Sequence, residues 1–217
     1  MKRHELIKTS PLRLLSPVEG GQVAGRHLAL VKGPAGTGKT AVLVQIALDT
    51  LLRGEEVVHV GVNHTLEKIK LWYGEVFAAL ARQVNLANAT GVENEIMGHR
   101  LLMTFMADNF TPLRLAQRLD ALGRHHIALP ACLVIDGLVA EPGIYEELRI
   151  FALEHNLTMW LSCPEGPSPA DKAADTLLEL QTSPEGVTSL VVVRDDAGYA
   201  RPGAAMTLDA QALNLCR

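Results

Sequence analysis

The stretch Gly33-Pro34-Ala35-Gly36-Thr37-Gly38-Lys39-Thr40 matches the phosphate-binding pattern G-x-x-x-x-G-K-[ST] at every fixed position. An apolar run precedes it at residues 27–31, and a helical pattern begins at Lys39 and extends to about Leu52. A strand, a glycine-rich loop and a helix in this order form the setting in which this pattern binds phosphate. The alternative is a glycine-rich turn that matches by chance, and it leaves the matching flanks unexplained.

The residue types of this loop suit the binding of a triphosphate. Glycines tolerate the backbone angles with which a loop wraps around an anion, and they leave N–H groups free to point inward. The N-terminus of the following helix adds partial positive charge. Lys39 supplies a full charge to the outer phosphates, and the Thr40 hydroxyl is placed to bind Mg²⁺. We therefore expect every residue of Gly33–Thr40 to contribute to a nucleoside triphosphate site.

Length and composition indicate one α/β domain. The chain has 217 residues, and we divide it into a lead-in at residues 1–26 and a single nucleotide-binding domain at residues 27–217. Hydrophobic residues make up 48% of the chain but aromatic residues only 4%, so the core should be aliphatic. The net charge of −4 disfavours a protein held on nucleic acid by general electrostatics.

Cysteine usage and hydropathy favour a cytoplasmic protein. The three cysteines have no metal-binding spacing, and two of them lie in apolar runs where buried thiols are common. The N-terminal residues lack the apolar segment of a signal peptide, and no apolar run reaches the length of a membrane span. We therefore expect a reduced, cytoplasmic setting without membrane insertion.

Strand and helix patterns alternate along most of the chain. The expected strands lie at residues 27–31, 56–62, 100–105, 131–136 and 157–163, with short strands at 176–180, 189–194 and 205–208. The expected helices lie at residues 39–52, 65–83, 111–124 and 144–155, with Thr65 as a candidate N-cap and residues 85–97 expected to be loop. This order predicts a three-layer α/β/α fold with a mostly parallel central sheet and a C-terminal antiparallel extension.

A second motif lies on the fourth expected strand. The run Leu133-Val134-Ile135-Asp136 places a carboxylate at the tip of a buried strand. In nucleotide-binding proteins of this type such a carboxylate holds Mg²⁺ through water, opposite the loop hydroxyl, which here is Thr40. Many buried strands end in Asp, so this motif alone is weak. It indicates a nucleotide site here because a phosphate loop precedes it in the chain.

The whole layout resembles the RecA/RadA/KaiC family of P-loop ATPases, which includes the DnaB-type helicase cores. The resemblance covers most of the chain and rests on the segments Pro11–Leu15 with Gly20-Gly21, Gly33–Thr40, Asp136, Ala174–Leu180 and Leu190–Gly198. It implies a RecA-like P-loop NTPase fold that binds ATP and Mg²⁺. It also implies assembly into rings or filaments, with ATP bound between neighbouring subunits.

The chain departs from this family where the water-activating glutamate is expected. Just after the second strand the sequence has Asn63 and His64 in its place. An asparagine orients a water but cannot take its proton, whereas His64 could act as a base or be a surface histidine at the start of the helix. Glu67 lies about one turn further on and is a further candidate. Gly137 follows Asp136, so a glutamate beside that aspartate is also absent.

The resemblance also implies a basic residue that reaches the γ-phosphate of the neighbouring subunit. Only Arg194 remains of the usual basic pair, Asp196 falls at the second position, and Arg201 lies close by. The alternative interpretation of Arg194 and Arg201 is that both are solvated arginines in a loop. Ser162, at the tip of the fifth strand, is a candidate sensor of the γ-phosphate.

Three functions stay open from the sequence. The leading one is a cytoplasmic RecA/KaiC-like ATPase, slow or regulated, in which a positioned water attacks the γ-phosphate. The second is a non-hydrolysing protein that binds ATP to regulate or assemble with a partner. The third is a small-molecule kinase, although the sequence has no arginine-rich lid. Recombinase or helicase activity is not expected, because phosphate contacts need Lys or Arg and the loops at residues 137–143 and 164–172 contain two glutamates, one aspartate and only one lysine. ATP is preferred over GTP because no N-K-x-D segment is present.

Overall fold

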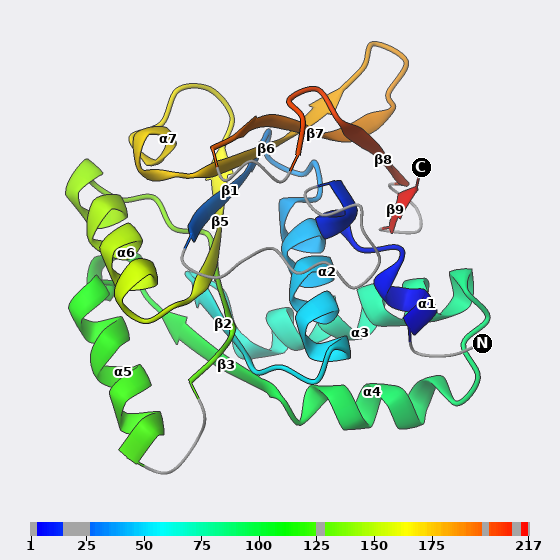
Figure 1. Cartoon of the computed structure of the whole chain (residues 1–217), viewed down its shortest axis with the longest axis horizontal. Helices are drawn as coiled ribbons and strands as arrows, with labels where there is room; N and C mark the ends of the chain where they lie inside the picture. Colours follow the sequence, from blue (N-terminus) through cyan, green and yellow to red (C-terminus); the bar gives the residue numbers. More distant parts are fainter. Residues whose placement is uncertain (1–3, 15–26, 125–128, 197–199, 210–213, 217) are drawn as a thin grey trace.

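A nine-stranded sheet, in the order β3-β2-β4-β5-β1-β6-β7-β8-β9, forms the middle layer of the part of the chain that is described (Figure 1). The computed structural model describes residues 4–14, 27–124, 129–196, 200–209 and 214–216. The strands are β1 (His27–Gly33), β2 (Val57–Val62), β3 (Arg100–Phe105), β4 (Cys132–Asp136), β5 (Thr158–Pro164), β6 (Thr176–Thr182), β7 (Thr188–Asp195), β8 (Ala205–Asp209) and β9 (Asn214–Cys216). The helices are α1 (His4–Ile7), η1 (Pro11–Leu14), α2 (Lys39–Leu52), α3 (Leu66–Gln83), α4 (Ala89–Met97), η2 (Ala107–Asn109), α5 (Pro112–Arg124), α6 (Pro142–Glu154) and α7 (Ala170–Ala173).

The central strands are parallel and fully buried, as the sequence patterns predict. All residues of β1, β2 and β4 are buried, because helices cover both faces of this part of the sheet. Residues 41–52 of α2 are buried as well, which explains why this helix is apolar nearly all round. The outer helix α3 is amphipathic instead, and Thr65 caps it by accepting a hydrogen bond from the Lys68 amide at 3.2 Å.

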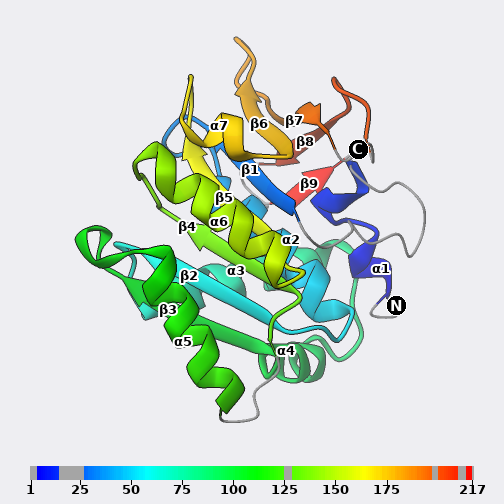
Figure 2. The same ribbon diagram turned by 60° about the vertical axis from the view of Figure 1, so that its left-hand side comes forward.

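Two hydrophobic clusters lie on opposite faces of the sheet. One cluster joins the sheet to α2, α3 and α4, with Ile46, Phe77 and Ile96 among its members. The other joins it to α5, α6 and α7, with Leu115 and Leu148 among its members. Figure 2 shows α5, α6 and α7 together in front of the sheet, with α2 and α3 behind it. This is the expected three-layer α/β/α arrangement.

The last strands run antiparallel and extend the sheet beyond β1. Strand β6 pairs with β1 in parallel, and β7, β8 and β9 then add in antiparallel order. The predicted C-terminal antiparallel extension is therefore confirmed, with β9 as a further strand. Within the described ranges, no helix combines the length and apolar character that a membrane crossing needs.

The structure corrects two expectations. Residues 89–97, expected to be loop, form α4, whose only buried side chain is Ile96. The expected loop at residues 164–172 contains the start of the short helix α7, which spans Ala170–Ala173. Part of the lead-in forms α1 and η1. Residues 20–21 and 197–198, which belong to segments that carry the family resemblance, lie outside the described residues.

Candidate functional site

The register of the sheet gathers the predicted site residues at the carboxyl ends of the parallel strands. Val31 pairs with Ser162, and Gly61 pairs with Asp136, so the tips of β1, β5, β4 and β2 lie side by side. In open α/β sheets, ligands bind beyond these strand ends. The phosphate loop leaves β1 at the same edge and leads into α2.

The phosphate loop has the backbone that an anion cradle needs. Gly36 and Gly38 have φ values of 81° and 98°, in the left-handed region that favours glycine. Gly38 is also the N-cap of α2, and no side chain caps the helix there. The first N–H groups of α2 therefore lack a side-chain acceptor, which is the arrangement that binds phosphate at a helix N-terminus.

The Lys39 side chain folds back into this loop. Its Nζ donates hydrogen bonds to the carbonyl oxygens of Gly33, at 2.7 Å, and Pro34, at 2.6 Å. Thr37 Oγ1 also donates to the Pro34 carbonyl, at 2.9 Å. Burial lowers the pKa of Lys39, and the negative charge of Asp136 opposes that effect. The ammonium is thus held inside the loop, where a phosphate oxygen could replace the carbonyls as its partner.

Thr40 and Asp136 come together as the two motifs predict. Thr40 Oγ1 donates a hydrogen bond to Asp136 Oδ2 at 2.7 Å, and the Asp136 side chain is buried. A hydroxyl and a carboxylate next to a phosphate cradle are the oxygen donors that Mg²⁺ takes in such sites. The residues present therefore fit a nucleotide-bound Mg²⁺.

Of the three candidates for water activation, His64 is the one that contacts Asp136 among the described residues. His64 Nε2 is 3.6 Å from Asp136 Oδ2, and the imidazole side chain is 23% exposed. His64 directly precedes the helix, and Thr65 caps it as expected. The imidazole is a partly exposed neighbour of the Asp136 carboxylate.

Asn63 and Glu67 do not reach the same point. Asn63 has a φ of 58°, and its Oδ1 accepts a hydrogen bond from the Ala107 amide at 2.9 Å. Its own amide donates to the Phe105 carbonyl at 2.8 Å, so the residue joins β2 to the end of β3. Glu67 is exposed in the first turn of α3. The left-handed backbone at Asn63 thus directs His64 toward Asp136.

Ser162 supports the turn that follows Asp136. Its Oγ accepts a hydrogen bond from the Gly137 amide at 2.8 Å, and the side chain is buried. This contact holds the backbone in place directly after the carboxylate. A role as a γ-phosphate sensor stays a prediction.

Arg194 contacts α7 rather than the phosphate loop of its own chain. Its Nη2 donates to the carbonyl oxygens of Asp171, at 2.7 Å, and Ala174, and its Nε pairs with Asp196 at 3.1 Å. No sequence pattern points to these partners, because they depend on how β7 packs beside α7. An action on ATP would require a second subunit and release from these carbonyls. Arg201 is exposed.

Sequence reasoning missed two buried polar pairs near the site. Lys32, directly before the loop, pairs through Nζ with both carboxylate oxygens of Asp171, at 2.7 and 2.8 Å. His59, in the middle of β2, lies 3.1 Å from the Tyr73 hydroxyl through Nδ1, and burial lowers its pKa to about 4. A lysine or histidine inside an apolar strand is the only signal that the sequence offers for such pairs.

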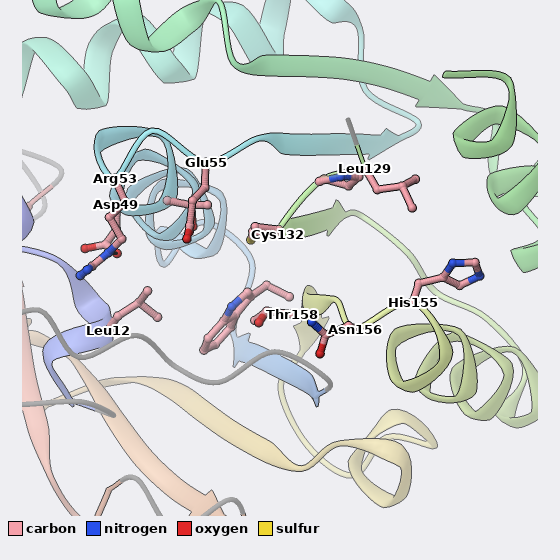
Figure 3. Close-up of a pocket in the computed structure, with 13 residues that line it drawn as sticks. Leu12, Asp49, Arg53, Glu55, Leu129, Cys132, His155, Asn156 and Thr158 are labelled. Carbon is pink, nitrogen blue, oxygen red and sulfur yellow. Dashed lines mark hydrogen bonds and ion pairs between the residues drawn. The ribbon is translucent and has the colours of Figure 1, made fainter. Parts of the chain in front are cut away.

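A separate cavity of about 390 Å³ lies at the opposite end of the sheet (Figure 3). Cys132 and Thr158, the first residues of β4 and β5, line it together with Asp49 and Arg53 of the end of α2. Cys132 and Asp136 are the two ends of β4, about 13 Å apart at the usual rise per residue. This cavity is therefore not the nucleotide site. No cluster of three or more His, Cys, Asp and Glu side chains that could hold a metal ion occurs among the described residues.

Comparisons with known proteins address the fold. No family model matches the chain, and no curated protein matches it. A solved structure described as an ATPase domain matches with a TM-score of 0.66 and 12% sequence identity, over 89% of this chain and 85% of that one. At this identity the likeness concerns the fold alone. Together with the strand order and the phosphate loop, it shows that the chain has the RecA-like P-loop NTPase fold.

Proposed function

We propose that this chain is a cytoplasmic ATP-binding protein of the RecA/KaiC type that hydrolyses ATP slowly, by attack of water on the γ-phosphate. The single observation that carries the proposal is the convergence of Thr40, Asp136 and His64 beside the phosphate loop. Thr40 Oγ1 lies 2.7 Å and His64 Nε2 lies 3.6 Å from the same carboxylate oxygen. This supports a metal-binding pair with a proton acceptor next to it.

Each residue has a distinct task in this proposal. The backbone amides of Gly33–Thr40 bind the phosphates, and Lys39 transfers its hydrogen bonds from the loop carbonyls to the outer phosphates. Thr40 and Asp136 hold Mg²⁺, which neutralises charge on the phosphate oxygens when it is bound. His64 Nε2 accepts the proton of the attacking water. Arg194 of a neighbouring subunit completes the site if the chain forms a ring or filament.

The alternative is a protein that binds ATP without hydrolysis and passes its nucleotide state to a partner. It is favoured by one specific observation: the side chain at position 63 contacts the Ala107 amide instead of the Asp136 carboxylate. Neither position after β2 carries a glutamate. Histidine is a weaker assignment for the base than glutamate, which is why we propose slow turnover.

ATP turnover by the purified protein, with Lys39→Ala as the blank, tests the proposal. We expect turnover above the blank that falls at least about tenfold in His64→Gln, the size of effect expected when a general base is removed. Wild-type protein that binds ATP tightly without turnover would overturn the enzyme and leave the alternative. Absence of ATP binding would overturn both.

Two glutamate variants test whether slow turnover results from a missing general base or from a site that is incompetent for other reasons. In His64→Glu, a carboxylate is placed beside Asp136, and we expect faster turnover if the rest of the site is competent. Asn63→Glu is the matched control, because its backbone is left-handed and its side chain points to the end of β3. Equal turnover in both variants would contradict the assignment of position 64 as the place of the base.

A further inference from the structure

A second cavity, of about 460 Å³, is lined by His64 and lies at the carboxyl end of β3. Helix α5 supplies its second wall. Figure 2 shows α5 beside β3 and β2, with the ends of these strands on the same side as the turn that leads into α5. The volume is within the range of about 300 to 1,000 Å³ that small-molecule sites have.

The two permanently charged side chains that line this cavity, Arg114 and Arg118, are both cationic. Arg114 and Arg118 are one helical turn apart on α5, so their side chains are neighbours, and His64 lines the same cavity. None of the described residues that line the cavity is acidic, although Asp and Glu outnumber Lys and Arg by 24 to 20 in the whole chain. A protein with a net negative charge thus places two arginines here without an acidic residue beside them in the described cavity lining.

Neutral groups hold both guanidinium groups in place. Arg118 donates through Nη1 to the Thr104 carbonyl at 3.1 Å, and its guanidinium carbon lies 4.1 Å from the centre of the Phe105 ring. Arg114 donates through Nη1 to the carbonyl and side-chain oxygens of Asn109, at 3.1 and 2.7 Å. Within the described ranges neither arginine forms an ion pair. Both are therefore oriented and still have N–H donors for an anion.

We propose that this cavity binds a small organic anion, either a carboxylate or a phosphate ester. Arg114 and Arg118 would hold the anionic group, since a guanidinium fork matches the oxygens of both groups. Met106, which is 62% exposed, offers apolar contact for the body of the ligand, while the buried Phe105 ring supports Arg118 from below. Carboxylate and phosphate both offer more than one acceptor oxygen to such a fork, so the experiment below uses one probe of each kind.

His64 connects this cavity to the proposed nucleotide site. Its imidazole lines the cavity and also lies 3.6 Å from the Asp136 carboxylate. An anion that attracts the imidazole competes with Asp136 for it, so the ligand and Mg²⁺–ATP change each other's affinity by the same factor. This second step rests on the proposed function. The proposal that the cavity binds an anion does not depend on the proposed function, and it can be tested without nucleotide.

The first test measures anion binding in the Lys39→Ala protein, whose phosphate loop is impaired, by NMR titration with inorganic phosphate and separately with succinate. We expect saturable shifts of the Arg114 and Arg118 Nε–H signals and of the His64 ring signals with at least one probe.

Binding should weaken at least about fivefold in Arg118→Gln, as expected when a charge-assisted contact is lost. It should be retained in Arg82→Gln, which alters an exposed arginine in the last turn of α3. Shifts that do not saturate, or that are unchanged in Arg118→Gln, would overturn the proposal.

The second test measures the coupling in wild-type protein. We expect the affinity for a non-hydrolysable ATP analogue with Mg²⁺ to change at least about threefold when succinate saturates the cavity, and this change to disappear in Arg118→Gln. An unchanged affinity in wild type would overturn the link through His64. If the wild-type protein binds no nucleotide, the proposed function fails. The titration in Lys39→Ala still shows in that case whether the cavity binds an anion.

Discussion

A Cβ atom on Gly137 would lie 2.6 Å from the carbonyl oxygen of Val62. The ends of β4 and β2 approach so closely here that the residue after Asp136 has no room for a side chain. Gly137 also has a φ of 87°, and the same Cβ atom would be 3.0 Å from His64 Nε2. The absence of a side chain at position 137 is therefore what allows Asp136 and His64 to meet.

Gly137→Ala is expected to destabilise the protein and to separate His64 from Asp136. The left-handed backbone costs an alanine about 1 kcal/mol, and the contact with the Val62 carbonyl adds about 2 kcal/mol because backbone atoms must move. Gly186→Ala is the matched control: its φ is 83°, and nothing lies within 4 Å of the added Cβ atom. Urea unfolding should show a loss of about 3 kcal/mol in the first variant and about 1 kcal/mol in the second. Equal losses would contradict the role of the close approach.

The layers and the pair of Thr40 and Asp136 were predictable because they follow from repeated local signals. Helix α2 occupies the residues that its apolar pattern indicates, Lys39–Leu52, since burial on all sides and a glycine near either end define its limits. Thr40 and Asp136 belong to motifs whose place at the strand ends follows from the parallel sheet. The sequence therefore contains enough information to bring them together.

The rest depends on tertiary contacts that no local pattern encodes. Helix α4 contains Gly91 and Asn94 and has a single buried side chain, Ile96, so it depends on packing against α2 and α3 rather than on helix propensity. The choice between Asn63 and His64 as the residue facing Asp136 depends on one left-handed backbone angle at Asn63. Asparagine tolerates that angle but does not require it.

Thr40→Val is expected to weaken metal-dependent nucleotide binding selectively. The valine has the shape of threonine but cannot bind Mg²⁺ or donate to Asp136 Oδ2. We expect the affinity for ATP with Mg²⁺ to fall about tenfold or more, equivalent to about 1.4 kcal/mol. Affinity measured in a metal chelator should change less than about twofold, and Thr40→Ser should restore most of the loss. A loss of equal size with and without Mg²⁺ would show that Thr40 acts only on the phosphates.

The stability of the protein should fall in acid because of His59. Burial lowers the pKa of this side chain to about 4 from an ordinary value of 6.5, and it stays neutral beside the Tyr73 hydroxyl. Between these two values the unfolded chain binds more protons than the folded one, so the free energy of unfolding decreases as the pH falls from 6.5 to 4. The contribution of His59 is on the order of 3 kcal/mol, and it adds no pH dependence above about 7.

Unfolding by urea at several pH values, in wild type and His59→Asn, measures this contribution. Asparagine can keep a hydrogen bond to Tyr73 but does not titrate. The free energy of unfolding of the His59→Asn protein should therefore vary less than that of wild type between pH 6.5 and 4. His155→Asn is the control, because His155 is exposed, and it should follow the wild-type curve. Parallel curves for wild type and His59→Asn would show that other groups cause the acid sensitivity.

Asp171→Asn should destabilise the strand that carries the phosphate loop. The Lys32 side chain is only 5% exposed, and it donates to both Asp171 oxygens and to the Gly166 carbonyl at 2.6 Å. Removing the carboxylate leaves a buried ammonium without a counter-charge, which costs about 3 kcal/mol. The double variant Lys32→Met/Asp171→Asn should recover much of this loss, because methionine fills the space without a charge. In urea unfolding, the double-mutant cycle should give a coupling of at least about 1 kcal/mol, whereas additive losses would mean that the two residues stabilise the fold independently.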